Sequence, residues 1–386
     1  MSTVSQVKSV IEMAARVPHY LPRVAYEHLR PWVSCYCSRS GTSSYPTTLI
    51  FFLTHKCNMR CKMCGLWGTH GTASEAASLR PGSGQQPSDQ LTVTEYADII
   101  RQVTFCKPTI TLFGGEPFVF KDWEAVAHLV KAARLRCRIV TNGLLLEKNA
   151  AKLVALGVDK VTVSIDGPAP IHEDVRGVKG AFEKAMRGIR ALDALKRSRR
   201  REKPVVSVVC TISQFNHAHL VDLAEALKDE PISLLAFQHL TFIDPTTYEQ
   251  HAREVSSLLH TTSESCKGFV TPEHNLDPQV LIAQIHRLSQ NSYPFPVLFR
   301  PNFPIKELVA YYTNPAYTRR SHRQCVAPWR EAYVMPDGSL TPCLDYGVGN
   351  LRTTSFRELW NNARFRRFRE VIKKHGRFPF CHKCCN

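Results

Sequence analysis

The sequence has 386 residues, of which 44% are hydrophobic, so it can bury the core of a large domain plus a small one. Its 50 Lys and Arg against 33 Asp and Glu give a formal net charge of +17, which suits an anionic substrate, a nucleic acid or an acidic membrane surface. There is no apolar run of about 18 residues and no signal-peptide core, which argues against a membrane span and favours the cytoplasm.

Residues 1–44 form an N-terminal extension in which apolar side chains recur at helical spacing from Val7 to Val17. We expect this amphipathic stretch to pack on the main domain. Contact with a membrane surface or a partner protein is the alternative.

Residues 45–240 alternate apolar strands with amphipathic helices. The expected strands cover 48–54, 109–113, 138–141, 160–165, 205–212 and 233–240, and the expected helices cover 91–103, 123–135, 150–156, 181–195 and 219–227. Because strands that alternate with helices pair in parallel, we predict an α/β fold with a partial (β/α)6 barrel. Residues 68–90 predict a mobile loop, 241–315 a less periodic connecting region that shapes the substrate pocket, and 316–386 a small cysteine-bearing domain.

The first of two cysteine groups among fourteen cysteines is Cys57, Cys61 and Cys64, directly after the first strand. In a parallel barrel the loops after the strands form the active face. Three thiolates can hold a 4Fe–4S cluster and leave one iron open. A closed zinc site would need a fourth ligand, for which His55 is the candidate.

Small and polar residues follow the next strands. Gly114 and Gly115 let the backbone approach a ligand closely, and Glu116, before Pro117, can accept a hydrogen bond from an ammonium group. Further along, Asn142 lies in a Thr-Asn-Gly segment, Ser164 in Ser-Ile-Asp-Gly and Arg176 in Val-Arg-Gly. Asn216, Gln238 and His239 are further candidates to line a cavity.

With these motifs, residues 47–240 resemble the radical S-adenosylmethionine (radical SAM) superfamily. The resemblance implies a catalytic cluster on Cys57, Cys61 and Cys64 whose open iron chelates S-adenosylmethionine. One electron, from a reductant such as flavodoxin or ferredoxin, then releases a 5′-deoxyadenosyl radical that abstracts hydrogen from the substrate. It also implies a set of cofactor-binding residues: Gly114, Gly115, Glu116, Pro117, Asn142, Ser164 and Arg176.

The second cysteine group lies in the last seventy residues. Cys325, Cys343 and the pair Cys381 and Cys384 can supply four thiolates for a second 4Fe–4S cluster or for zinc, and spacing alone leaves both open. An Asp-Gly turn before Pro-Cys and a final CxxC make residues 325–386 resemble the auxiliary-cluster extension called SPASM, or its short form Twitch. The resemblance implies one auxiliary cluster, with Cys385 as a rival to Cys384. Electron transfer is its simplest task, and anchoring of the C-terminal fold is the alternative.

Three functions remain. The first is oxidation of a small molecule such as a sugar, aminocyclitol or lipid headgroup, since short single-cluster forms resemble inosamine dehydrogenases. The second is modification of a ribosomally made peptide. The third is a non-catalytic zinc protein that binds nucleic acid, which the absence of stacking aromatics or a recognition motif disfavours, so no nucleic-acid partner is expected.

Overall fold

The computed structural model describes residues 21–38, 40–68, 71–73, 90–271, 274–320, 324–343 and 345–384, with side chains from Leu29 onward. The amphipathic stretch predicted between residues 7 and 17, most of the 68–90 loop and Cys385 lie outside these described residues. None of the helices in the described ranges is long and apolar enough to cross a membrane.

The described strands form one ten-stranded sheet in the order β10-β9-β8-β1-β2-β3-β4-β5-β6-β7. All neighbours from β8 through β1 to β7 pair in parallel, whereas β8 with β9 and β9 with β10 pair antiparallel. The strand bounds are β1 (Thr48–Phe52), β2 (Thr109–Phe113), β3 (Arg136–Thr141), β4 (Lys160–Ser164), β5 (Val205–Ile212), β6 (Leu235–His239), β7 (Val297–Arg300), β8 (Glu331–Val334), β9 (Ser339–Thr341) and β10 (Gly349–Asn350). The predicted partial barrel is confirmed, and the sheet continues beyond it at both edges.

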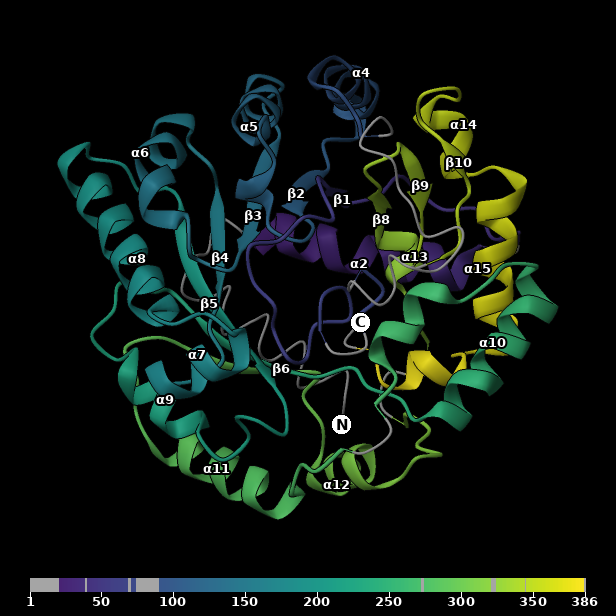
Figure 1. Cartoon of the computed structure of the whole chain (residues 1–386). Helices are drawn as coiled ribbons and strands as arrows, with labels where there is room; N and C mark the ends of the chain where they lie inside the picture. Colours follow the sequence, from purple (N-terminus) through teal and green to yellow (C-terminus); the bar gives the residue numbers. More distant parts are fainter. Residues whose placement is uncertain are drawn as a thin grey trace.

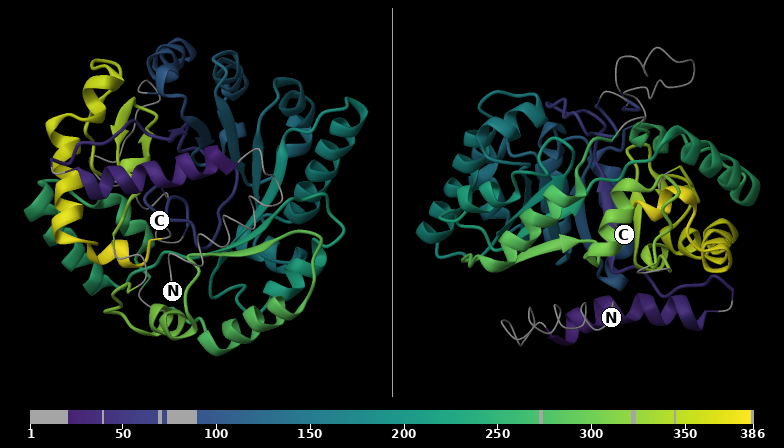
Figure 2. Two further views of the ribbon diagram at one scale, coloured as in Figure 1. Left: turned by 180° about the vertical axis from the view of Figure 1, so that it is seen from behind. Right: turned by 90° about the horizontal axis from the view of Figure 1, so that it is seen from below.

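Figure 1 shows the sheet curved into a ring, with helices such as α4, α5, α6, α8 and α11 on its outside. The helices are α2 (Leu21–Cys37), α4 (Val93–Val103), α5 (Trp123–Ala132), α6 (Leu146–Leu156), α7 (Ala169–Arg176), α8 (Ala181–Ser198), α9 (Leu220–Ala226), α10 (Pro245–Leu259), α11 (Pro278–Gln290), α12 (Ile305–Thr313), α13 (Ala327–Arg330), α14 (Phe356–Trp360) and α15 (Ala363–His375). Seen from behind, α2 crosses the ring (Figure 2). The helix α2 therefore lies behind the ring in the view of Figure 1.

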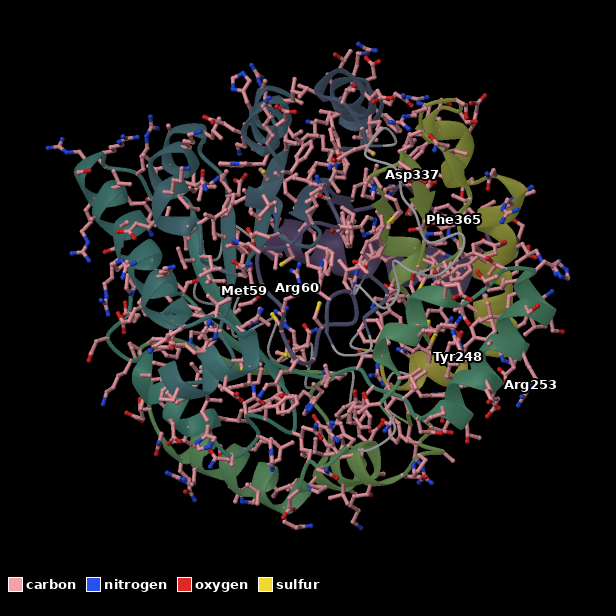
Figure 3. The ribbon with its side chains drawn as sticks, in the orientation of Figure 1. Met59, Arg60, Tyr248, Arg253, Asp337 and Phe365 are labelled. Atoms are coloured by element: carbon pink, nitrogen blue, oxygen red, sulfur yellow. The ribbon has the colours of Figure 1, made fainter. Side chains whose placement is uncertain are left out.

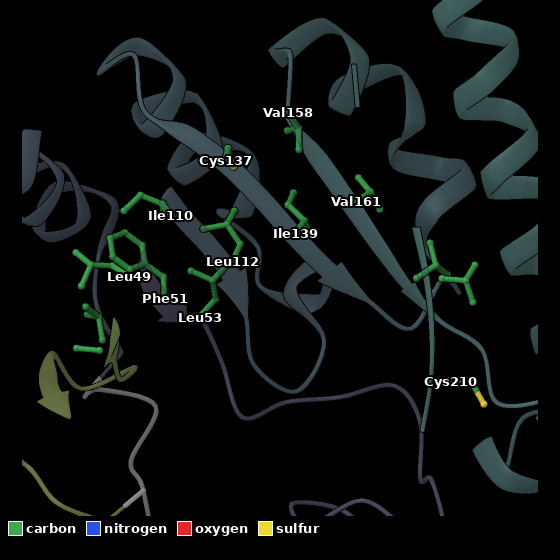
Figure 4. Packing of buried hydrophobic residues seen from close by; sticks show 14 of the residues in the cluster. Leu49, Phe51, Leu53, Ile110, Leu112, Cys137, Ile139, Val158, Val161 and Cys210 are labelled. Atoms are coloured by element: carbon green, nitrogen blue, oxygen red, sulfur yellow. The ribbon is translucent and has the colours of Figure 1, made fainter. Parts of the chain in front are cut away.

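The core lies between the sheet and the outer helices. Along β1 to β4, every second side chain is buried there, including Leu49, Leu112, Ile139 and Val161 (Figure 4). Because successive side chains of a strand point to opposite faces, the alternate residues point into the ring. These alternate residues are the ones that can meet a substrate.

Two segments differ from their prediction. Residues 241–315 are not merely connecting, because they contain α10, α11, α12 and the strand β7, which pairs with β6. Four residues are too few for a strand pattern to stand out in the sequence. The apolar pattern over residues 356–374 predicts a single helix, but the structure has two there, because the side chain of Asn362 accepts a hydrogen bond from Phe365 N at 2.8 Å and so begins α15.

The C-terminal domain is joined to the barrel through the sheet. β8 pairs with β1 from Thr48 opposite Glu331 to Phe51 opposite Val334. In addition, Trp360 Nε1 donates to Ser44 O at 2.9 Å, which ties α14 to the segment before β1. The regions that carry the two cysteine groups are therefore joined through one continuous sheet.

Arg369 is a buried cation in this junction, and no sequence pattern identified it. It is 0% exposed and lies 3.9 Å from the ring of Phe365. Its guanidinium donates to Pro328 O at 2.8 Å, to Gly41 O at 3.2 Å and to Asn361 Oδ1 at 2.8 Å. It thereby connects the N-terminal segment, α13 and the turn before α15.

We expect Arg369→Ala to lower the free energy of unfolding by about 3 kcal/mol, because it removes hydrogen bonds to a charged group and leaves carbonyls unpaired. Arg366→Ala is the control, since Arg366 lies on the exposed face of the same helix. Anaerobic urea titration of both variants measures the effect. Equal losses in the two would contradict the anchoring role.

Candidate active site

The first cysteine group lies in the loop after β1, at the centre of the ring. Met59 is 1% exposed and packs with Cys61 and Ala181, which fixes the middle of the loop. The guanidinium of Arg60 donates to Cys57 O at 3.0 Å and to Met59 O at 2.9 Å. Figure 3 labels Met59 and Arg60 there, with side-chain sulfurs nearby. Sequence reasoning missed Arg60, which holds the loop through its carbonyls.

The three thiols of this group lie close together. Burial raises the pKa of Cys61 to about 11 and also raises that of Cys57, and the nearby Cys64 thiol raises the pKa of both further. Backbone N–H groups already face the sulfurs, since Trp67 N donates to Cys64 Sγ at 3.3 Å. Three neighbouring thiols, of which Cys61 is buried and Cys57 and Cys64 are partly buried, fit an iron–sulfur cluster, whose binding would release their protons.

In the described ranges, no three His, Cys, Asp or Glu side chains converge in the way that ligands of one metal ion would. The fit to a cluster therefore rests on the donor set. The ring nitrogen Nε2 of His55, the candidate fourth ligand for zinc, is buried and has no hydrogen-bond partner among the residues that the structure describes. Burial also lowers the pKa of His55, so its ring is neutral.

Gly114 and Gly115 bring the end of β2 against the chain that leads to the cysteines. A Cβ at Gly114, where φ is +141°, would lie 2.5 Å from Thr54 O, and one at Gly115 would lie 2.3 Å from Lys56 O. Gly115 N donates to Thr54 O at 2.8 Å. The structure thus shows a second reason for glycine at these positions. A side chain there would prevent the end of β2 from contacting the segment that leads into the cysteine loop.

Glu116 connects the end of β2 to the end of β3. It is 0% exposed, and burial raises its pKa to about 7. Its carboxylate accepts hydrogen bonds from Thr141 Oγ1 at 2.8 Å, Asn142 N at 2.8 Å and Phe118 N at 3.2 Å. Pro117 is buried and begins the short 3-10 helix η4 (Pro117–Val119). The motif after β2 and the one after β3 therefore form one hydrogen-bonded unit.

Asn142 extends this unit to the cysteine loop. Its Nδ2 donates to Asn58 Oδ1 at 2.7 Å and lies 3.9 Å from Cys57 Sγ. Ser164 ends β4 on the inner face, and its hydroxyl makes no hydrogen bond within the described part of the chain. The amide of Asn142 therefore orients the loop, whereas the hydroxyl of Ser164 is available to a ligand.

Arg176 lies at the end of α7, a helix that the sequence analysis did not predict. Its Nε is 2.6 Å from Asp166 Oδ2, and the two side chains are 11% and 0% exposed. Its Nη1 is 3.7 Å from Cys61 Sγ. The guanidinium therefore places a positive charge beside the Cys61 thiol and is oriented by Asp166. Its predicted pairing with a cofactor carboxylate stays a prediction.

Two further candidates are buried rather than cavity-lining. Asn216 is 0% exposed and donates to Asp166 O and Thr211 O, both at 2.8 Å. His239 is 1% exposed on the outer face of β6, with Nδ1 2.7 Å from the hydroxyl of Tyr312. Both residues hold elements together.

The C-terminal thiols also gather. Burial raises the pKa of Cys343, and Cys381, Cys384 and Cys325 raise it further. Cys381 lies in the 3-10 helix η6 (Pro379–His382), and Arg377 donates to its carbonyl at 2.9 Å. Four partly buried thiols fit the closed ligand set of a second cluster.

Cys266 is a fifth thiol beside this set, although its isolated place in the sequence favours an ordinary buried structural cysteine. It is among the groups that raise the pKa of Cys343, and its sulfur lies 3.5 Å from His251 Nε2. It also lines a cavity of ≈ 40 Å³ together with Cys343 and Cys381. The fold brings it there from η5 (Glu264–Phe269), far from the other thiols in sequence.

Residues 51–227 match the family model of the radical SAM superfamily, and residues 325–385 match that of the iron–sulfur cluster-binding domain SPASM. The chain is a radical SAM enzyme. It uses a 4Fe–4S cluster and S-adenosylmethionine, and its SPASM domain adds auxiliary iron–sulfur binding. The gathered thiols of both domains agree with that assignment.

Relatives of this radical SAM enzyme align with most of the chain. The AdoMet-dependent heme synthase of Methanosarcina barkeri is 28% identical over 87% of this chain and 88% of its own. The subtilosin biosynthesis protein AlbA of Bacillus subtilis is 22% identical over 89% and 68%. The solved structure of Streptococcus suis SuiB covers 89% of this chain and 71% of its own, with 11% identity and a TM-score of 0.58, which shows a shared fold.

Proposed function

We propose that this radical SAM enzyme oxidises a small organic molecule by two electrons, with the auxiliary cluster as electron acceptor. The catalytic cluster and S-adenosylmethionine on Cys57, Cys61 and Cys64 supply a 5′-deoxyadenosyl radical. The substrate gives up a hydrogen atom to that radical, and then one electron to the cluster on Cys325, Cys343, Cys381 and Cys384 and one proton to solvent.

The observation that carries this proposal is the join between the two cysteine-bearing regions. The catalytic thiols follow β1, and the C-terminal thiols flank β8, which hydrogen-bonds to β1 along four residue pairs. An electron acceptor in a rigid extension of the same sheet stays at a constant separation from the reaction chamber. A cluster that merely anchored the C-terminal fold would not need this placement.

The names of relatives support two substrate classes. Because several relatives are named heme synthases, a tetrapyrrole is a further candidate substrate beside the predicted sugar, aminocyclitol or lipid headgroup. AlbA, named for bacteriocin biosynthesis, supports a peptide as the alternative. Incubating the enzyme with members of each class deuterated at C–H positions, and measuring deuterium in 5′-deoxyadenosine, identifies the class. A cytoplasmic location and a flavodoxin or ferredoxin as reductant remain part of the proposal.

We expect Cys343→Ala to lower the iron content from about eight to about four per chain, because each cubane holds four irons. This variant should still form some 5′-deoxyadenosine but should no longer complete substrate oxidation. Iron analysis and Mössbauer spectra after anaerobic reconstitution measure the first effect, and product analysis measures the second.

Cys266→Ala is the matched control, since Cys266 is a buried thiol beside the same set that we do not assign as a ligand. It should keep about eight irons. Unchanged iron in Cys343→Ala, or a loss in Cys266→Ala alone, would overturn the ligand assignment. Full substrate oxidation by an iron-depleted Cys343→Ala would overturn the role as electron acceptor.

A further inference from the structure

The helix α2 carries apolar side chains on the face that points away from the protein. Among residues 29–37, whose side chains the structure describes, Pro31 and Cys35 are buried. On the opposite face, Leu29, Val33 and Tyr36 are 62%, 58% and 59% exposed. Because they are four and three positions apart, these three residues form one stripe along the helix, which we call the α2 stripe. A surface helix normally turns polar side chains outward, so the α2 stripe indicates a surface that another body covers.

The α2 stripe lies on one outer side of the molecule. The right-hand view of Figure 2 shows α2 as the outermost described helix on its side, and the left-hand view shows it crossing the ring. The helix packs against α13, which directly precedes β8, so it lies at the edge of the sheet where the parallel strands begin. The cysteine loop follows the end of β1 and lies at the opposite edge. A flat surface that approaches from behind the ring therefore meets the α2 stripe first.

Other exposed apolar side chains lie at the same edge of the sheet. Phe105, in the 3-10 helix η3 (Thr104–Cys106) before β2, is 41% exposed, and its ring centre is 4.6 Å from that of Tyr45. Val205, the first residue of β5, is 43% exposed. With the α2 stripe, Phe105 and Val205 make up five of the seven large hydrophobic residues that are exposed in the described part of the chain. The apolar exposure is therefore concentrated on the side that carries α2.

Cations surround these apolar residues. The guanidinium of Arg357 lies 4.1 Å from the ring centre of Phe105. At the end of α2, Lys373 Nζ donates to Cys35 O at 2.8 Å and to Tyr36 O at 3.2 Å. The loops before β2, β3 and β5 add further exposed cations, which are Lys107, Arg134 and the three arginines at 199–201. This edge of the sheet therefore combines apolar side chains with a rim of positive charge.

Few carboxylates oppose these cations. Asp159, before β4, is paired with Lys131 at 2.6 Å and with Lys203 at 2.5 Å. Glu202 and Asp229 are exposed in the loops before β5 and β6. Since cations predominate at this edge and the whole chain has a formal net charge of +17, this side of the protein attracts an anionic surface.

We propose that this side of the protein docks on an anionic lipid bilayer, with the α2 stripe at the boundary between headgroups and acyl chains. Amphipathic helices bind bilayers in this way, and each nearby Lys or Arg strengthens the attachment to anionic headgroups. Trp32, whose ring stacks on that of Tyr36 at 5.6 Å, adds an aromatic pair of the kind that favours the interface. A second copy of this chain would bring two cationic rims together, so the charge favours lipid as the occupant. The cysteine loop, at the opposite edge, faces away from the bilayer.

The test is flotation of the anaerobic holoenzyme with vesicles of phosphatidylcholine, either alone or mixed with phosphatidylglycerol. The wild type should bind the anionic vesicles at least about tenfold more tightly than the neutral ones, and the binding should weaken as sodium chloride is added. Leu29→Ser/Val33→Ser should bind the anionic vesicles at least about tenfold more weakly than the wild type. Val280→Ser/Ile305→Ser, which alters exposed apolar residues of α11 and α12, should bind like the wild type.

No binding of the wild type to the anionic vesicles, or equal binding by the wild type and Leu29→Ser/Val33→Ser, would overturn the proposal. Light scattering without lipid tests the second copy as occupant. A wild-type dimer that the same double variant converts to monomers would make the α2 stripe an interface between copies and would also overturn the proposal. Iron content and cleavage of S-adenosylmethionine by the double variant should match the wild type, which shows that it is folded and loaded.

Discussion

Cys57→Ala should abolish the cleavage of S-adenosylmethionine. Two thiolates cannot hold a cubane cluster, and even loss of an outer partner of a metal ligand costs about 10–100-fold in affinity or activity. We therefore expect at least about 100-fold less 5′-deoxyadenosine under dithionite reduction. Iron should fall from about eight to about four per chain, because the auxiliary cluster remains.

Cys106→Ala is the control for this variant. Cys106 lies in the short helix η3 (Thr104–Cys106) after α4, where its thiol is 3.2 Å from Val103 O. It should keep both the iron and the cleavage activity. Continued formation of 5′-deoxyadenosine by Cys57→Ala would refute the catalytic cluster assignment.

Arg176→Met should be among the most destabilising single substitutions in the barrel. It would leave the carboxylate of Asp166 buried at 0% exposure without its cation, and breaking a buried pair in this way costs about 3–5 kcal/mol. Anaerobic urea titration measures the loss. Asp166→Asn/Arg176→Met, which removes both charges, should lose less than the two single substitutions added together.

Arg187→Met provides the matched comparison. Its ion pair with Glu147 has a similar distance of 3.1 Å, but the two side chains are 49% and 51% exposed. Such exposed pairs contribute about 0–1 kcal/mol. If Arg176→Met and Arg187→Met lowered the free energy of unfolding equally, the claim that the buried Asp166–Arg176 pair stabilises the barrel would be refuted.

Alternating strands and helices made β1 to β6 predictable, because each strand is long enough to show its burial pattern. The four-residue strand β7 was missed for the opposite reason. The break between α14 and α15 depends on Asn362, whose side chain caps the second helix. An Asn within a helical pattern does not by itself predict such a cap. The predicted bounds of β1 to β6 were therefore nearly right, whereas the helix cap at Asn362 was not predicted.

Cys57, Cys61 and Cys64 were predictable as a group because they lie within eight residues, whereas Cys325 and Cys343 stand apart and were added to the final CxxC through the family resemblance. The partners that orient them were not, since Arg60 acts through backbone carbonyls and Asp166 through a residue ten positions later. Cys266 shows the same limit, because only the fold brings it beside Cys343.

The pairing of β1 with β8 has a consequence for synthesis on the ribosome. Thr47 and Arg330, which hydrogen-bond at this junction, are 283 residues apart. The strand that leads into the catalytic cysteines is made early, yet one of its edges stays unpaired until nearly the whole chain has emerged. Parallel pairing over such a distance is slow, and open strand edges aggregate. The nascent barrel should therefore depend on chaperones, and cluster loading should follow completion of the chain.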